Sequence, residues 1–285
     1  MNKIKIIILI IIIALVGFSY FEYFKQTSKK VIITKEDFTI TVNGKDYNVI
    51  VGKPPQKSEK YSLVIYHHGG GYKTLEPFEL RKLYQIIAKE GFLVWIPERT
   101  PMTSLLGEGW QTFEEARYVS KEILNIALNH PEVDKNNINV IGFALSAGAV
   151  VEENIYSPNV RSISLLGFGA PITEAVLYNT FNDLVEKEID YSKVSPKIFI
   201  MVSKEDTSAD TKLAEIFRQK LVEAGKVVDC IEYPEGNHLR MVGDKDYLVD
   251  LIKYLEGEEI KTTDIIETNK YILEMRRKSR EGGYW

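Results

Sequence analysis

The sequence predicts an α/β protein with a mostly parallel, doubly wound sheet. Short apolar runs rich in β-branched residues alternate along the chain with stretches that carry apolar residues at helical spacing. Several of the apolar runs lead directly into residues that carry chemistry, namely histidines, a serine, carboxylates and a run of glycines. Because the carboxyl ends of parallel strands meet at one edge of a sheet, we expect these residues to share a crevice there.

The chain enters this sheet through an antiparallel hairpin. Residues 37–42 and 45–51 alternate between apolar and polar side chains, as half-buried strands do. They are separated by Asn43-Gly44, a dipeptide that favours a tight two-residue turn. We therefore expect the first two strands to pair antiparallel.

The remaining elements alternate between strand and helix. The expected strands cover residues 61–66, 92–97, 137–141, 161–166, 197–203 and 227–233. The expected helices cover residues 80–89, 113–127, 211–224 and 247–255. Such alternation implies right-handed crossovers and a parallel core. The interval 171–196 has room for a small helical flap but not for a large lid.

Length and composition favour one domain with a substantial core. The chain has 285 residues, of which 45% are hydrophobic, and we place the globular domain at residues 37–256. The formal net charge of −4, without a basic stripe interleaved with aromatic residues, argues against nucleic-acid binding. The single cysteine, Cys230, excludes an internal disulfide and a cysteine zinc cluster. We expect no metal site and no cofactor.

The segment around Ser146 predicts a nucleophile. It follows the expected strand 137–141, and a serine raised above a sheet edge needs a sharp strand-to-helix turn. The residues two before and two after such a serine must be small, and Ala144 and Gly148 meet that demand. We expect a helix to begin at Ala147, so that its N–H serves as one donor of an oxyanion hole. The alternative is an ordinary tight turn with no catalytic role.

A run of three glycines, residues 69–71, follows the expected strand 61–66. Without side chains the main chain can approach a ligand closely, and we expect the amides of Gly70 and Gly71 to complete the oxyanion hole. A flexible glycine turn is the alternative. A phosphate-binding loop is disfavoured because no Lys-Ser or Lys-Thr pair follows the glycines.

The chain has four histidines, and most of them are poor candidates for a catalytic base. His67 and His68 precede the glycines, and His130 closes a helical stretch that should end away from the crevice. His238 remains, in a loop after the expected strand 227–233, where its imidazole can reach a serine hydroxyl. A surface histidine with no role is the alternative.

An acid is needed to orient that imidazole. The expected strand 197–203 ends directly before Lys204, Glu205 and Asp206. We expect Asp206 to be this acid, with Glu205 as its close competitor. Either carboxylate could instead cap the helix that begins near Ala209.

These residues resemble those of the α/β-hydrolase superfamily. The order Ser146, Asp206, His238 is the order of that superfamily's triad, and His68 through Gly71 matches its HGGG loop. The resemblance covers residues 37–256 and is greatest to small esterases, lipases and dienelactone-hydrolase-like proteins. Two departures are evident: Ala144 replaces the usual first glycine of the elbow, and dienelactone hydrolases proper use a cysteine where this chain has Ser146.

The resemblance implies an α/β-hydrolase fold and a serine hydrolase that cleaves carboxylic esters through an acyl-enzyme intermediate. His238 would take the Ser146 proton, Ser146 would attack the ester carbonyl, and Asp206 would orient the imidazole. The expected partner is a small-molecule ester. A peptidase or an acyltransferase would use the same residues. The alternative from another class is a non-catalytic binding protein on the same fold.

An apolar segment precedes the domain. Residues 6–21 are uncharged and mostly aliphatic, and as a helix they would extend about 24 Å, just enough to cross a bilayer. An aromatic collar follows, as at membrane interfaces. We therefore assign residues 1–24 as a membrane anchor and 25–36 as a tether, with the hydrolase domain outside the cytoplasm. The alternative is a cleaved signal peptide and a secreted protein, since Gly17 and Ser19 are small residues at suitable processing positions.

The chain ends in a charged segment, residues 257–285, with a basic cluster at 275–280. We expect a solvated terminal helix and tail. The alternative is contact with anionic lipid or with a partner protein.

Overall fold

The computed structural model describes residues 37–69, 76–98, 108–171, 175–206, 208–236, 238 and 245–263. All of them belong to one compact unit, Ile33–Trp285. The expected anchor and tether, residues 1–36, lie outside the described residues, as do Gly70, Gly71 and residues 264–285 of the expected tail. None of the described helices combines the length and the apolar character needed to cross a membrane.

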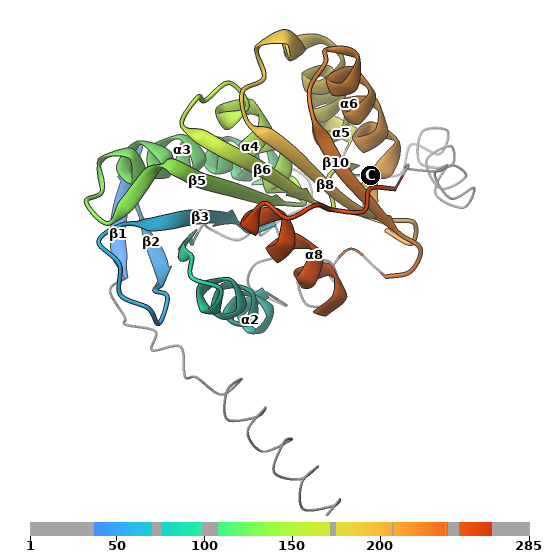
Figure 1. The fold of residues 1–285 in the computed structure, drawn as a ribbon. Coiled ribbons are helices and arrows are strands. Elements are labelled where there is room, and N and C mark those ends of the chain that lie inside the picture. Colours follow the sequence, from blue (N-terminus) through green and yellow to red (C-terminus); the bar gives the residue numbers. More distant parts are fainter. Residues whose placement is uncertain are drawn as a thin grey trace, which may run out of the picture. The chain divides into compact units, whose positions relative to one another are not determined.

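The centre of the fold is an eight-stranded sheet with the order β1-β2-β4-β3-β5-β6-β8-β10 (Figure 1). Its strands are β1 (Phe38–Val42), β2 (Lys45–Gly52), β3 (Tyr61–His67), β4 (Leu93–Pro97), β5 (Val133–Phe143), β6 (Val160–Leu166), β8 (Lys197–Ser203) and β10 (Val228–Tyr233). β2 pairs antiparallel with β1 and β4, and the other neighbouring pairs are parallel. The predicted α/β class, parallel core and antiparallel N-terminal pair are confirmed.

Helices cover both faces of this sheet, as a doubly wound fold requires. They are α2 (Glu76–Lys89), α3 (Glu108–Asn129), α4 (Leu145–Asn154), α5 (Ala175–Asp183), α6 (Thr211–Glu223) and α8 (Lys245–Glu256). In Figure 1, α3, α4, α5 and α6 lie on one face, and α2 and α8 lie on the other. The central strands are thus enclosed from both sides, which explains why β3 and β4 are nearly continuous apolar runs.

The N-terminal hairpin turns through Asn43 and Gly44, whose φ angles are 50° and 76°. Both angles are positive, as a type I′ turn requires, and Asn and Gly adopt such angles most readily. The register pairs Val42 with Lys45, so the predicted two-residue turn is confirmed.

Two boundaries around the predicted nucleophile differ from expectation. β5 continues to Phe143, beyond the expected end at residue 141. α4 begins at Leu145, so the expected helix start at Ala147 was wrong by two residues. The strand-to-helix turn therefore lies at Ala144.

The region between β6 and β8 contains the expected small helical insertion. α5 is followed by a π-helical turn, η1 (Leu184–Glu188), and by a short 3-10 turn, η2 (Tyr191–Lys193). A short strand before α5, β7 (Ala170–Pro171), pairs antiparallel with β9 (Ala209–Asp210), which lies directly before α6. This pair connects the insertion to the segment that follows the expected acid.

Thr263, which follows α8, bonds to β10, the strand at one edge of the sheet. The Thr263 N–H donates a hydrogen bond to the Cys230 carbonyl at 2.8 Å, and the Thr263 hydroxyl accepts one from the Glu232 N–H at 2.6 Å. Cys230 itself is buried. The first part of the expected solvated tail is thus bonded to β10, where it occupies backbone groups that an edge strand would otherwise present.

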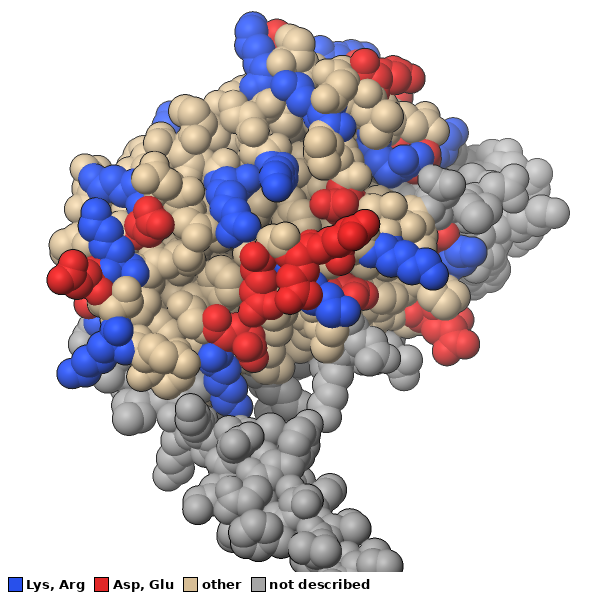
Figure 2. Space-filling model, viewed as in Figure 1, with Lys and Arg blue, Asp and Glu red and all other residues tan. Residues whose placement is uncertain are grey.

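Charged side chains of both signs are interspersed on the face drawn in Figure 2, and the largest group near its centre is acidic. Glu256, Glu258 and Glu259 are exposed at the end of α8 and just after it. Partial desolvation, and then the charges of Glu258 and Glu90, raise the pKa of Glu256. The distribution agrees with the formal net charge of −4.

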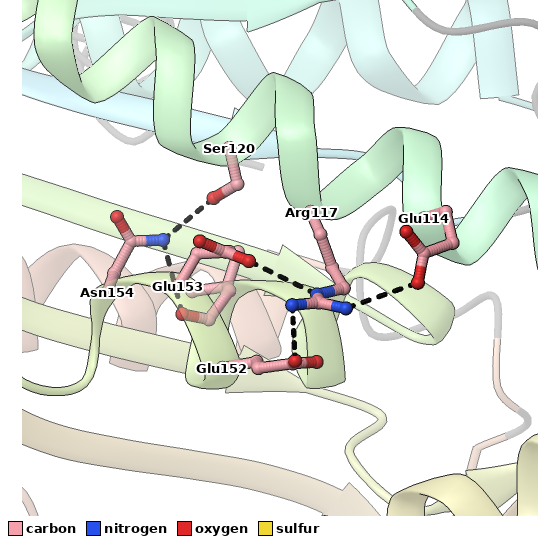
Figure 3. Close-up of polar contacts among 7 residues, drawn as sticks. Glu114, Arg117, Ser120, Glu152, Glu153 and Asn154 are labelled. Atoms are coloured by element: carbon pink, nitrogen blue, oxygen red, sulfur yellow. Dashed lines mark hydrogen bonds and ion pairs between the residues drawn. The ribbon is translucent and has the colours of Figure 1, made fainter.

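An ionic cluster ties α4 to α3 (Figure 3). Arg117 of α3 contacts the carboxylates of Glu152 at 2.6 Å and Glu153 at 3.1 Å, both in α4. It also contacts Glu114 of its own helix at 3.2 Å. Burial is the largest cause that raises the pKa of Glu152, to about 7, and the positive charge of Arg117 offsets only part of this effect.

A buried amide strengthens the same connection. The Asn154 side chain donates to the Ser120 hydroxyl at 2.7 Å and to the Val150 carbonyl at 3.1 Å. Asn154 and Ser120 are both buried, so loss of either partner would leave a polar group unsatisfied in the interior. The carboxyl-terminal half of α4 is therefore fixed against α3.

Ionisation of Glu152 should make stability depend on pH. Its folded pKa of about 7 lies above the ordinary value of 4.5, so the contribution of Glu152 to stability is fully present below pH 4.5 and is lost as pH rises through about 7. Glu152→Gln imitates the protonated side chain and should equal wild type near pH 4.5. At pH 8 we expect its thermal midpoint to be higher by about 2–4 °C, the shift that about 1 kcal/mol produces in a domain of this size, allowing for solvent screening.

The matched control for this prediction is Glu153→Gln. It removes a carboxylate from the same guanidinium and should give no gain in thermal midpoint at pH 8. An equal loss of stability in the Glu152→Gln protein at both pH values would contradict the prediction.

Candidate active site

Asp206 lies just beyond β8 and is fully buried. Its Oδ1 accepts hydrogen bonds from the N–H groups of Ser208 at 2.8 Å and Ala209 at 3.0 Å. Its Oδ2 lies 2.6 Å from Nδ1 of His238. The backbone donors thus fix the carboxylate so that one oxygen remains for the imidazole.

His238 follows β10, the strand beside β8, and its side chain is 14% exposed. Its ring lies 4.9 Å from the ring of Phe143 at an interplanar angle of 32°. With Nδ1 donating to Asp206, the tautomer leaves Nε2 as the nitrogen able to accept a proton. The structure therefore brings together the expected base and the expected acid.

Glu205, the competing carboxylate, has a different set of contacts. Its Oε2 accepts a hydrogen bond from the Gly236 N–H at 2.9 Å. The Ser203 hydroxyl donates to the Gly236 carbonyl, and the Tyr247 hydroxyl donates to the carbonyl of Glu235. These bonds connect the loop that carries His238 to the end of β8 and to α8, whereas Asp206 contacts the imidazole.

The sharp turn after β5 has Ala144 at its apex. Ala144 adopts φ 51° and ψ −120°, a left-handed conformation that residues with a side chain rarely take. Beneath it, a Cβ on Gly142 would lie 2.7 Å from the Cα of Ala147 and 2.9 Å from the Ser146 carbonyl oxygen. Gly142 is therefore required where the start of α4 passes over the strand.

Ser146 lies in the first turn of α4 and is fully buried. Its hydroxyl donates a hydrogen bond to the carbonyl of His68 at the end of β3. The Ala147 N–H, expected as an oxyanion donor, donates to the Ala144 carbonyl at 3.0 Å within the turn. A Cβ on Gly148 would lie 2.4 Å from ring carbons of Phe181, so Gly148 allows α5 to pack against α4.

The first glycine of the run lies beside the turn. A Cβ on Gly69 would be 3.2 Å from the Cβ of Ala144 and 3.1 Å from the ring of Phe143. His68 is buried, and its Nδ1 lies 2.8 Å from the Gly69 carbonyl oxygen. The expected oxyanion donors Gly70 and Gly71 lie outside the described residues.

His130 lies near the amino end of β5, whereas Ser146 follows its carboxyl end. It follows α3 and precedes Val133, the first residue of β5, and its ring packs edge-on against Trp95 at 5.1 Å. This position agrees with the expectation that His130 lies away from the crevice. Among the residues that the structure describes, no group of three or more His, Cys, Asp or Glu side chains is arranged to hold a metal ion.

Sequence reasoning missed Gly142, and it placed Ala144 beside the apex of the turn instead of at the apex. A signal was present, because the pattern Gly142-x-Ala144-x-Ser146 also has small residues two before and two after its centre. This pattern overlaps the predicted pattern Ala144-x-Ser146-x-Gly148. In the structure the turn is centred on Ala144, as the first pattern predicts, and not on Ser146.

Comparison with known proteins gives matches by structure but none by sequence. No family model matches the sequence, and no curated protein matches it. A putative dienelactone hydrolase from Klebsiella pneumoniae subsp. pneumoniae superposes with a TM-score of 0.56 at 14% identity, over 78% of this chain and 95% of that one. Thermogutta terrifontis esterase 2 gives a TM-score of 0.56 at 14% identity, over 78% and 93% of the two chains. The Pyrococcus horikoshii acylaminoacyl peptidase gives 0.58 at 16%, over 84% of this chain and 44% of the peptidase.

These structures carry the names of hydrolases with different substrates. Identities of 14–16% relate their folds to this one and leave the substrate open. The strand order and these likenesses together establish that the chain has the α/β-hydrolase fold.

Proposed function

We propose that the protein is a hydrolase of carboxylic esters in which His238 is the base and Asp206 orients its imidazole. The observation that carries the proposal is the 2.6 Å contact between Asp206 Oδ2 and His238 Nδ1. A fully buried carboxylate held by backbone donors is well suited to fix one imidazole tautomer and to stabilise the imidazolium that forms during catalysis.

In the proposed reaction, Ser146 is the nucleophile. Its proton passes to Nε2 of His238 as its oxygen bonds to the carbonyl carbon, and the carbonyl electron pair moves to the oxygen. Collapse of this intermediate expels the alcohol, which takes the proton from His238, and water then hydrolyses the acyl-enzyme by the same steps. Amides of Gly70, Gly71 and Ala147 are the proposed donors to the oxyanion.

This role requires two hydrogen bonds to open. The Ser146 hydroxyl must leave the His68 carbonyl, and the Ala147 N–H must leave the Ala144 carbonyl. Until both open, the Ser146 proton is bonded to the His68 carbonyl and the Ala147 amide proton is bonded to the Ala144 carbonyl, so neither can act on a substrate.

Two structural matches that extend over nearly the whole of the compared chains support a small ester as the substrate. The putative dienelactone hydrolase and the esterase have 95% and 93% of their length covered by this chain. The acylaminoacyl peptidase has only 44% covered. A peptidase or an acyltransferase would nevertheless use the same proposed residues.

The position of Ala144 favours a second candidate function. The apex of the turn carries a methyl group where a nucleophilic hydroxyl is needed. A protein with this apex could bind an acyl compound in the crevice without cleaving it. The two candidates differ in whether a serine of the wild-type chain reacts covalently.

Ser146→Ala tests the hydrolase directly. If Ser146 is the nucleophile, the variant should lose labelling by a fluorophosphonate and should hydrolyse esters at least about 10⁴-fold more slowly than wild type. Mass spectrometry of the labelled wild-type peptide should place the phosphonate on Ser146. Ser164→Ala, which changes a buried serine within β6, is the matched control and should label normally. Full labelling of the Ser146→Ala protein would exclude Ser146.

A second pair of variants tests the acid. Asp206→Asn should lose most ester turnover while keeping its thermal midpoint near that of wild type, because the amide favours the wrong imidazole tautomer. Glu205→Gln should keep most turnover, because its amide oxygen can still accept the Gly236 N–H. The reverse pattern of activities would assign the acid to Glu205.

We also propose that residues 6–21 anchor the protein in a membrane with the hydrolase domain outside the cytoplasm. The support is the length and composition of the apolar segment and the aromatic collar after it. The protein should remain with membranes through carbonate washing, and protease added to the outer face should digest the domain. A mature chain that begins near Tyr20 and is free in the medium would establish secretion instead.

A further inference from the structure

We infer that residue 144 occupies the nucleophile position in this conformation, and that Ser146 reaches it only when the turn shifts by two residues. The inference rests on the proposed hydrolase function and deepens it, because it makes attack by Ser146 conditional on a change in the turn.

The first support is the geometry of the turn. A catalytic serine on this kind of sheet sits at the apex of a strained strand-to-helix turn, where its hydroxyl stands above the sheet edge. Here the apex residue is Ala144, with φ 51° and ψ −120°. Residues with a side chain keep such angles only when the surrounding structure imposes them. Here the Cα of Ala147 lies so close to Gly142 that a Cβ on Gly142 would be only 2.7 Å from it, and this close packing is such a constraint.

The second support is the set of groups around Ala144. Its Cβ is 3.2 Å from the point that a Cβ on Gly69 would occupy, so it lies against Gly69. The preceding side chain, Phe143, packs on the ring of His238. A hydroxyl on residue 144 would therefore lie beside Gly69 and one residue from the side chain that contacts the base.

The third support is the environment of Ser146. The side chain is fully buried, and its hydroxyl proton is donated to the His68 carbonyl. A fully buried hydroxyl is closed to an ester substrate, and its hydrogen bond to the His68 carbonyl must open before the serine can attack. In this conformation Ser146 therefore cannot form an acyl-enzyme.

The shift must be local, because the rest of α4 is fixed. Arg117 holds Glu152 and Glu153 near its carboxyl end, and Phe181 packs against Gly148 one turn beyond the start. Unwinding residues 144–147 would open the Ala147–Ala144 hydrogen bond and release Ser146 while leaving these contacts in place.

The sequence pattern Ala144-x-Ser146-x-Gly148 supports this alternative turn. With Ser146 at the apex, its flanking residues would be Ala144 and Gly148, which are both small enough for a sharp turn. If this turn is populated in only a small fraction of molecules, the reactivity of Ser146 falls in proportion to that fraction.

The experiment compares rates of fluorophosphonate labelling in the full-length wild-type chain, in Ser146→Ala and in the double variant Ala144→Ser, Ser146→Ala. The double variant places a hydroxyl at the apex without any shift. We expect it to label at position 144 at least tenfold faster than wild type labels at position 146, and we expect no labelling of Ser146→Ala. Peptide mass spectrometry identifies the labelled position.

The other outcomes separate this inference from the proposed function. Wild-type labelling as fast as that of the double variant would overturn the shift and leave the hydrolase proposal standing. Labelling of the double variant with none of wild type would overturn both the shift and the hydrolase proposal, in favour of binding without cleavage. A folded double variant that does not label, beside a wild type that does, would overturn the assignment of position 144.

Ala144→Gly gives an independent measurement that does not depend on the folding of the double variant. Glycine adopts positive φ without strain, so it should favour the recorded turn, raise the thermal midpoint and slow labelling at Ser146 at least twofold. Asn43→Gly is the matched control, because Asn43 also has a positive φ but lies in the N-terminal hairpin, and its labelling rate should equal that of wild type. Faster labelling of Ala144→Gly than of wild type would contradict the inference.

Discussion

The candidate active site depends on how closely α4 passes over the end of β5. Gly142 lacks the Cβ that would lie 2.7 Å from Ala147, and this absence lets the helix start three residues later, at Leu145. The close approach forces Ala144 into a left-handed conformation and turns Ser146 into the interior. It also fixes Phe143 at the position where its ring meets His238. The absence of one methyl group at Gly142 is thus linked both to the burial of Ser146 and to the contact between Phe143 and His238.

The acid–base half of the site depends on backbone hydrogen bonds in the same way. Two consecutive carboxylates follow β8, and they have separate roles: Glu205 holds the main chain of the loop at Gly236, and Asp206 holds the imidazole. The parallel pairing of Tyr233 with Ser203 places the ends of β10 and β8 side by side, so that both contacts can form. The loop that carries His238 is therefore positioned by its main chain as well as by its side chain.

Sequence reasoning predicted the features that are governed by local chemistry. The hairpin turn at Asn43-Gly44 follows from the angles that these two residues tolerate, and the buried strands follow from runs of apolar residues. The turn after β5 could not be predicted in the same way, because residues 142, 144, 146 and 148 are all small and permit a turn in two positions. The choice between them depends on contacts with distant segments, such as Phe181 against Gly148 and His68 against Ser146. Likewise, only the three-dimensional arrangement shows that Thr263 bonds to β10, because nothing in the local sequence marks this segment as part of the sheet edge.

The bonding of Thr263 along β10 affects how this molecule meets copies of itself. An uncovered parallel edge strand offers a row of amide and carbonyl groups to any other extended chain, and sheets of neighbouring molecules can join through it. Thr263 satisfies the Cys230 carbonyl and the Glu232 amide within the same molecule. These two groups are thus not offered to a strand of another molecule, which disfavours strand-by-strand joining along this part of β10.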